Sequence, residues 1–257
     1  MIGLFSAEGR SALRAFVNAH TLFAFDLDGT LVPIVANPAD IRIDTTVQDG
    51  MVVLTSLAAT AVITGRSRSD AAARLGFTPR YLVGNHGAEG VPGQEAESRE
   101  LLRTVAAWER QLLTLLPPQR RAGILLERKG YSLSLHYRHA PEPRSAHAAL
   151  LAAITALTPP PRRVAGKCVE NLLPLGAPHK GEALVRLLDV SGCVNAFFIG
   201  DDETDEDVFR LNDPRIFPVC VGADRATAAR YLLERQEDMS LLLNALVTLL
   251  RDGAVEM

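Results

Sequence analysis

Four acidic residues and one lysine are the side chains of this sequence whose types and spacing could do chemistry together. Asp26 and Asp28 follow the apolar run TLFAF, Asp201 and Asp202 follow AFFIG, and Lys180 opens the helix-like segment KGEALVRLLDV. The loops at the carboxyl ends of the strands of an open parallel sheet meet at one edge, so we expect these side chains to converge. Carboxylates that lie close together raise one another's pKa values, and a cation is then needed to offset their charge.

The types of these residues favour a hard cation bound together with a phosphate group. No His or Cys stands at a metal-binding spacing near them, and oxygen ligands that leave room for water suit Mg²⁺ better than Ca²⁺. Lys180 adds a compact positive charge, while the Thr64 hydroxyl and the N–H groups near Gly65 add donors for an anion. The pattern predicts a phosphate site that contains a carboxylate nucleophile. The alternative is a solvated turn at Asp26 and Asp28 and a surface position for Lys180.

Alternating strands and helices in the outer parts of the sequence would hold these residues. The runs TLFAF, AVIT, YLVG, AFFIG and IFPVCVG end at polar residues or glycine, and helix-like segments separate most of them. Short uncharged strands of this kind are typical of a parallel sheet covered on both faces. The ends of the second and third runs add further candidates to the same edge: Thr64, Gly65, Arg66, Asn85 and His86.

The middle of the sequence follows a different pattern. A helix, SRELLRTVAAWERQLLTLL, precedes two strand candidates, AGILLE and YSLSLHYR; a second helix, the proline loop TPPPRR and the extended stretch GKCVENLLP come after them. The short connection at 128–130 favours antiparallel pairing. We therefore expect an α/β fold with a Rossmann-like parallel-sheet core made of residues 1–92 and 174–257. An α+β cap domain, residues 93–173, would be inserted into it.

Four motifs in order, DLDGT, ITGR, a lysine that opens a later helix, and GDDETDED, resemble those of haloacid-dehalogenase-type phosphohydrolases. The resemblance implies that Asp26 is a nucleophile that forms an aspartyl-phosphate. Asp28 would protonate the leaving oxygen and later deprotonate the attacking water. Thr64 and Lys180 would bind the phosphoryl oxygens.

The same resemblance implies a Mg²⁺ cofactor. Its ligands would be Asp26, the backbone carbonyl of Asp28, and Asp201. Asp202 and Asp205 would complete the acidic surroundings of the ion, which makes the predicted metal set Asp26, Asp28, Asp201 and Asp202, with Asp205 outside it.

The place of the insertion narrows the family. Thr64 stands 38 positions after Asp26, which leaves room for a crossover only, whereas more than 100 positions separate Thr64 from Lys180. A cap between the second and third motifs is similar to the arrangement in sugar phosphatases. The stretches VGNHGAE, ERKGYSLSLHYR, GAPHKGEAL and GDDETDEDVF resemble the trehalose-6-phosphate phosphatase family in particular.

This closer resemblance implies a set of substrate contacts. Glu127 and Lys129 would hydrogen-bond the sugar hydroxyls, and in YSLSLHYR the alternation of side chains gives a polar face. Many members carry Glu and a basic residue where this sequence has Asn171 and Leu173. Asn171 can still bind hydroxyls, but Leu173 cannot replace a cation. The predicted substrate-binding residues are Gly65, Arg66, Asn85, His86, Glu127, Lys129, Arg138 and Asn171.

Composition limits the partners. The net charge of −3 comes from 27 basic and 30 acidic residues spread along the sequence, which disfavours nucleic-acid binding. No run has the length and apolar character of a membrane span or an export signal. We expect a cytoplasmic protein, a monomer or a dimer, that acts on a small sugar phosphate.

Three functions stay open. The first is a Mg²⁺-dependent phosphatase that releases trehalose from trehalose 6-phosphate, a step of trehalose biosynthesis. The second is a phosphatase for another sugar phosphate, of the sucrose, glucosylglycerol or mannosylglycerate type. The third is a non-catalytic sugar-phosphate sensor, which the presence of Asp26, Asp28, Lys180 and Asp201 disfavours.

Overall fold

The computed structural model describes residues 1–35, 41–166, 168–222 and 226–255. The chain separates into two compact units, one made of Met1–Pro92 and Pro178–Met257 and the other of Gly93–Ala177. None of the helices in the described ranges has the length and apolar character needed to cross a membrane.

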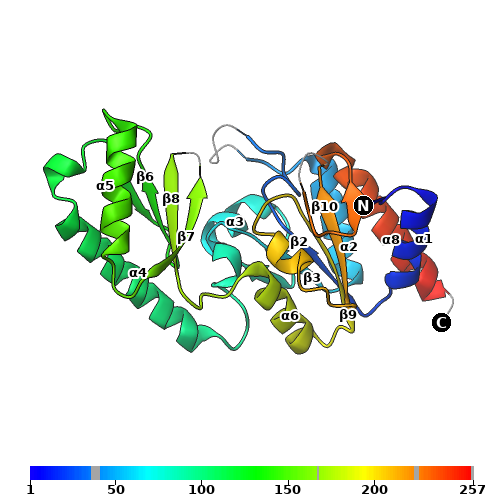
Figure 1. Ribbon diagram of the computed structural model, residues 1–257. Helices are drawn as coiled ribbons and strands as arrows, with labels where there is room; N and C mark the ends of the chain where they lie inside the picture. Colours follow the sequence, from blue (N-terminus) through cyan, green and yellow to red (C-terminus); the bar gives the residue numbers. More distant parts are fainter. Residues whose placement is uncertain (36–40, 167, 223–225, 256–257) are drawn as a thin grey trace. The chain divides into compact units, whose positions relative to one another are not determined.

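The first unit is built on a seven-stranded parallel sheet with the order β1-β11-β10-β9-β2-β3-β4 (Figure 1). The direction of the order reverses at β2, because β3 and β4 lie on one side of it and β9 to β11 lie on the other. Open sheets bind ligands at the carboxyl end of the strands at such a reversal. The strands are β1 (Ile2–Gly3), β2 (Thr21–Phe25), β3 (Thr60–Ile63), β4 (Tyr81–Val83), β9 (Asn195–Gly200), β10 (Ile216–Val221) and β11 (Tyr231–Leu233).

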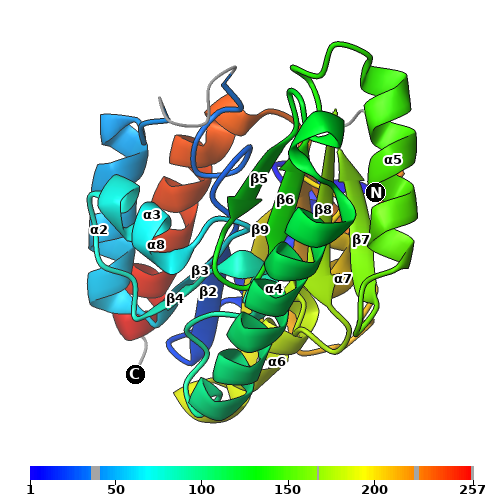
Figure 2. The ribbon, with the colours of Figure 1, turned by 90° about the vertical axis from the view of Figure 1, so that its left-hand side faces the viewer.

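Helices cover both faces of this sheet, which confirms the predicted α/β class. Phe23 and Phe25 of β2 pack into one core with α1, α2, α3 and α8, and α2 and α8 lie side by side (Figure 2). Leu22 and Ala24 pack into the other core with α6 and α7. Every residue of β2 is buried, and each Phe contributes roughly 2–3 kcal/mol of burial, so the strand is a rigid support. The helices are α1 (Ala7–Phe16), α2 (Thr45–Leu57), α3 (Arg68–Leu75), α6 (Lys180–Ser191), α7 (Glu206–Phe209) and α8 (Met239–Val255).

The second unit is a four-stranded antiparallel sheet with two helices on one face (Figure 1). Trp108 of α4 is fully buried against Leu133, Leu135 and Leu172 of the sheet. The order of the sheet is β5-β6-β8-β7. Its elements are α4 (Glu95–Leu115), β5 (Leu125–Arg128), β6 (Leu133–His136), α5 (Pro143–Thr155), β7 (Pro161–Gly166) and β8 (Val169–Pro174).

Strand β7 was not predicted, because TPPPRR was interpreted as a loop. Proline marks turns and cannot donate to a ladder, so Pro161 argues against a strand in the interior of a sheet. β7 is one of the two edge strands of this sheet, where one side of the strand has no neighbouring strand to pair with, and Pro161 is its first residue. At the edge of the sheet a strand can therefore form although the local proline-rich sequence predicts a loop.

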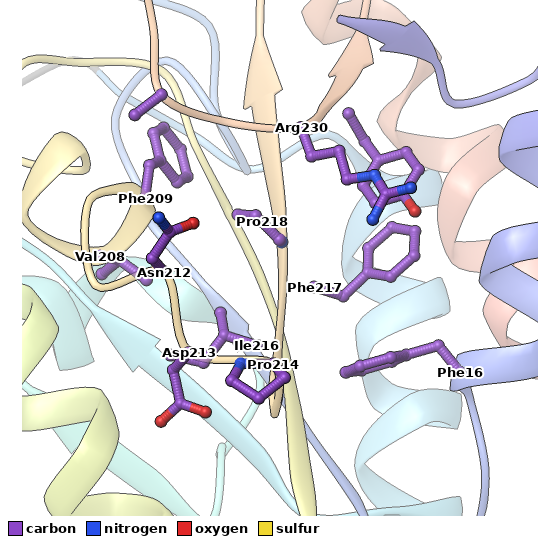
Figure 3. A pocket seen from close by; sticks show the side chains of 12 residues that line it. Phe16, Val208, Phe209, Asn212, Asp213, Pro214, Ile216, Phe217, Pro218 and Arg230 are labelled. Atoms are coloured by element: carbon purple, nitrogen blue, oxygen red, sulfur yellow. The ribbon is translucent and has the colours of Figure 1, made fainter.

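A cavity of about 290 Å³ lies beside the amino end of β10 (Figure 3). Phe217 stacks on Tyr231 with ring centroids 3.9 Å apart, and Phe16 of α1 lies 5.1 Å from Phe217. Arg230 lies over the Tyr231 ring at 5.6 Å. This cavity is at the amino ends of the strands, so it is separate from the edge where the acidic residues gather.

Candidate active site

The site is centred on an ion-paired group directly after β2. Lys180, the first residue of α6, donates from Nζ to Asp26 Oδ1 at 2.7 Å and to Asp205 Oδ1 at 2.8 Å. These side chains are 1%, 5% and 0% exposed. The N–H of Asp26 donates to the carbonyl of Ile199 in β9, so the backbone of the two central strands fixes its position.

The electrostatics of this group show an excess of negative charge. Burial raises the pKa of Asp26 well above its usual value, and the charges of Asp205 and Asp202 add to the effect. Burial, Asp205 and Asp202 raise the pKa of Asp201 to about 7. Burial opposes the charge on Lys180, but Asp205 and Asp26 raise its pKa, so it remains an ammonium group. The single ammonium of Lys180 is thus surrounded by the carboxylates of Asp26, Asp201, Asp202 and Asp205, and this excess of negative charge requires a further cation.

The donor set fits a hard metal ion. Carboxylate oxygens of Asp26, Asp201 and Asp205 lie within 4.8 Å of one another. The Thr30 hydroxyl donates to Asp201 at 3.4 Å, and a side chain at Gly29, whose φ is +84°, would collide with the same carboxylate. All the ligand atoms are oxygens, which suits a Mg²⁺-like ion. The cluster is therefore compatible with a bound metal.

Asp202 and Asp205 lie in different surroundings. Asp205, expected outside the metal set, contributes a carboxylate to the cluster. Asp202 Oδ1 instead accepts hydrogen bonds from the N–H and hydroxyl of Thr204 at 2.7 and 2.6 Å. Burial raises the pKa of Asp202, but Lys180 and the bonds from Thr204 lower it overall. The sequence does not indicate which of the three aspartates at positions 201–205 points inward, and the metal roles of Asp28 and Asp202 stay predictions.

The carboxylate of Asp28 is bound by Arg66 through two hydrogen bonds. Arg66 Nε donates to Oδ2 at 2.6 Å and Nη2 donates to Oδ1 at 2.7 Å. Arg66 Nη1 also donates to Asp70 at 2.7 Å, and Arg74 donates to Asp70 from the next turn of α3. Ser67 caps α3 immediately after Arg66. Asp70 and Arg74 are not among the predicted site residues, although the spacing of four residues between opposite charges indicates such a pair on a helix.

The ends of β3 and β4 bring the remaining core candidates together. Thr64 is fully buried, and its hydroxyl accepts from the N–H of Arg66 at 3.2 Å. The backbone N–H of Asn85 donates to the carbonyl of Arg66, and the backbone N–H of His86 donates to the carbonyl of Thr64. The His86 ring lies so close to Gly65 that a Cβ there would collide with it, so this position requires glycine. The predicted residues of the core unit all lie in loops or at helix starts at the carboxyl edge of one sheet. They are Asp26, Asp28, Thr64, Gly65, Arg66, Asn85, His86, Lys180, Asp201 and Asp202.

In the second unit, two of the predicted sugar-binding residues lie in strands of the sheet, and two lie in the segments that follow β5 and β6. Glu127 of β5 hydrogen-bonds His136 at 2.8 Å and is 3.4 Å from Lys129. Asn171 of β8 accepts from the Ser134 hydroxyl at 2.7 Å. Glu127 is opposite Ser134, and Ser134 is opposite Asn171, so these three share the face away from the helices. The last candidate, Arg138, is exposed and follows β6 outside the sheet.

Comparisons with known proteins agree with this geometry. The family model described as trehalose-phosphatase matches residues 24–236. A trehalose-phosphate phosphatase of Mycobacterium tuberculosis is 29% identical over 246 residues, which cover 89% of this chain and 62% of that relative. The chain thus spans about 62% of the length of such relatives. A trehalose-6-phosphate phosphatase of Escherichia coli is 32% identical over 206 residues, with 76% of this chain and 74% of the relative covered.

Solved structures show the same fold. The crystal structure of a trehalose-6-phosphate phosphatase related protein superposes with a TM-score of 0.70 at 24% identity. The match covers 92% of this chain and 100% of that one. Both the parallel-sheet unit and the smaller antiparallel unit therefore have a counterpart of known architecture.

Proposed function

This chain belongs to the trehalose-phosphatase family, and we propose that it hydrolyses trehalose 6-phosphate to trehalose and inorganic phosphate. The observation that carries the proposal is the buried group at the end of β2, where the Lys180 ammonium joins the Asp26 and Asp205 carboxylates. A buried carboxylate held by a cation on a rigid strand end is suited to attack a phosphorus atom from a fixed position.

In the first step, a carboxylate oxygen of Asp26 attacks the phosphorus, and the bond from phosphorus to the sugar oxygen breaks. Asp28 gives its proton to the leaving oxygen, so the sugar departs as a neutral alcohol. The phosphoryl group is then joined to Asp26 as an aspartyl-phosphate. Lys180, the Thr64 hydroxyl and the N–H groups near Gly65 stabilise the negative oxygens of the phosphoryl group.

In the second step, Asp28 takes a proton from a water molecule that attacks the same phosphorus. The bond to Asp26 breaks, inorganic phosphate leaves, and both carboxylates return to their starting state. In the structure Arg66 donates to both oxygens of Asp28, so one of these two hydrogen bonds has to open when Asp28 carries the proton, while the other still orients the carboxyl group. Asn85 and His86 line the same edge and contribute to substrate binding.

We propose that the metal ion is Mg²⁺. Asp26, Asp201 and Asp205 would hold it with the backbone carbonyl of Asp28, and Asp202 would stand close to this group. When bound, the ion supplies positive charge that offsets the carboxylates and the phosphoryl oxygens.

The second unit, in this proposal, is a cap domain that selects the sugar. Glu127, Lys129, Arg138 and Asn171 would contact its hydroxyl groups. Leu173 favours a second candidate, a phosphatase for a different sugar phosphate, since this position offers no hydrogen bond. A cytoplasmic location and a monomeric or dimeric state remain predictions.

Phosphate release from four esters tests the proposal: trehalose 6-phosphate, sucrose 6-phosphate, glucose 6-phosphate and p-nitrophenyl phosphate. Each is assayed with Mg²⁺ and with EDTA, with Asp26→Asn as the blank. We expect strong metal-dependent turnover of trehalose 6-phosphate. Preference for another sugar would overturn the substrate and keep the mechanism, whereas no turnover of any ester would favour the sensor.

A further inference from the structure

Two neighbouring arginines of β7 lie on opposite faces of the antiparallel sheet. Arg163 lies on the helix-covered face, where its Nε donates to Glu170 Oε2 at 3.2 Å. The Glu170 side chain is only 2% exposed, and His147 of α5 binds its other oxygen at 2.7 Å. The charge of Arg163 is thus matched by a buried carboxylate.

Arg162 is in a different position. It is directly opposite Leu173 in the ladder, two residues along β8 from Asn171, so it shares with that amide the face of the sheet that no described helix of this unit covers, the open face. Arg162 is half-buried and makes no hydrogen bond or ion pair with the residues that the structure describes. The acid on this face, Glu127, already has Lys129 and His136 as partners. The Arg162 guanidinium therefore keeps its donors for a ligand.

The backbone that carries Arg162 is held in place from the preceding loop. Trp108 Nε1 donates to the carbonyl of Pro159 at 2.6 Å. Gln111 donates to the carbonyl of Thr158 at 2.7 Å and accepts from its N–H at 2.9 Å. Both side chains come from α4, so the entry to β7 is fixed on the core of this unit. A ligand of Arg162 would have little backbone left to order, which favours binding.

We propose that Arg162 is a specificity-determining residue that donates hydrogen bonds to neighbouring hydroxyl groups of the sugar. A guanidinium presents several N–H donors in a planar fork, and adjacent ring hydroxyls offer two acceptors at a matching spacing. Asn171 lies on the same face; its amide oxygen accepts from Ser134 and one N–H donates to the carbonyl of Val164, which leaves the second N–H for a sugar hydroxyl. The inference rests on the proposed function, because it assigns the sugar of that substrate to this face.

The test compares Arg162→Ala with Arg162→Lys and with Arg103→Ala, a matched control at an exposed arginine of α4. Each full-length protein is assayed on trehalose 6-phosphate and on p-nitrophenyl phosphate, which has no sugar. We expect kcat/KM of Arg162→Ala for trehalose 6-phosphate to fall at least about tenfold, mainly through KM. Turnover of p-nitrophenyl phosphate stays as in the wild type. Arg162→Lys recovers part of the loss, and Arg103→Ala changes neither substrate.

Two results would overturn the proposal: an equal fall for both esters, which would mean a role in folding or phosphoryl binding, and no fall for either. Arg162→Lys decides the question if the alanine variant does not fold. Failure of the proposed function is seen separately, in the wild type. If the wild type prefers another sugar phosphate, kcat/KM of Arg162→Ala and of the wild type is compared on that ester and on p-nitrophenyl phosphate, and this comparison confirms or refutes the role of Arg162.

Discussion

The carboxyl edge of the parallel sheet and the open face of the antiparallel sheet both carry polar side chains, but they differ in burial and charge. At the first, Lys180 and its two carboxylate partners are at most 5% exposed. On the second, Lys129 and Glu127 are 38% and 46% exposed. Under the proposed function the two regions have separate tasks: bond breaking needs charges fixed in a site that excludes water, whereas recognition of hydroxyls would use hydrogen bonds near solvent.

The two regions also differ in the structural support that they need. Taking charges out of water costs several kcal/mol per ion, so the buried group requires a fold that is stable without it. Strand β2, buried at every residue, provides that support. In the proposed function the open face carries no reacting group, so its side chains should be replaceable without loss of the chemistry. Substitution should therefore affect the two regions very differently.

The largest effect should come from Asp26→Asn. The amide is a poor nucleophile, so we expect kcat to fall on the order of 10⁴-fold or more for every ester. The control is Asp49→Asn, at an exposed aspartate of α2, which should leave kcat unchanged. Residual activity of Asp26→Asn above a tenth of the wild-type value would show that the nucleophile lies elsewhere.

A comparison of two lysines sharpens the contrast in stability. Lys180→Met leaves two buried carboxylates without their ammonium, so the free energy of unfolding should fall by about 3–5 kcal/mol. In the same variant, kcat should fall by about 10²- to 10³-fold. Lys129→Met removes a half-exposed partner and should cost less than about 1 kcal/mol. Urea unfolding of both variants gives these values, and equal losses would contradict the contrast.

Asn171→Ala tests whether the open face acts on the sugar alone. Loss of one hydrogen-bonding amide should lower kcat/KM for trehalose 6-phosphate by about tenfold. Turnover of p-nitrophenyl phosphate should not change. Steady-state kinetics on the two esters measure the ratio, and a parallel fall would mean that Asn171 supports the sheet and not the substrate.

The smallest effect concerns stability and pH on the covered face of the same sheet. Burial raises the pKa of Glu170, but its bonds to His147 and Arg163 lower it overall. Its contribution to stability is therefore complete above the unfolded value of about pH 4.3 and is lost as the pH falls through the lower folded value. Glu170→Gln should cost about 1 kcal/mol at pH 7 and progressively less in acid.

The single tryptophan of the chain, Trp108, lies in the core of this unit and reports its unfolding by fluorescence. A stability difference between Glu170→Gln and the wild type that is the same at pH 7 and pH 3 would contradict the assigned ion pairs.

Much of the core could be predicted from the sequence, because each central strand is a short apolar run that ends at chemistry-bearing residues. Asp26 and Lys180 lie 154 positions apart in the chain, yet both mark the end or start of a recognisable element. Partners set by side-chain direction could not be predicted. The inward direction of the Asp205 side chain and the pairing of Arg66 with Asp28 depend on loop geometry, which the spacing of apolar residues in the sequence does not indicate.

The antiparallel unit was less predictable. Strand β7 depends on its position at the edge of the sheet, and its opening residues, Pro161 and Arg162, give the composition of a loop. Only the ladder shows that Arg162 is opposite Leu173. A cation can thus lie beside a position whose own residue has no charge, and such cross-strand relations need the structure.

The central claim, that Asp26 receives the phosphoryl group, is tested most directly by acid quenching during turnover of trehalose 6-phosphate. Mass spectrometry of the peptide that contains Asp26 should show the addition of one phosphoryl group in the wild type and none in Asp26→Asn. Turnover by the wild type with no phosphoryl group on this peptide at any quench time, or with the group on another residue, would contradict the account.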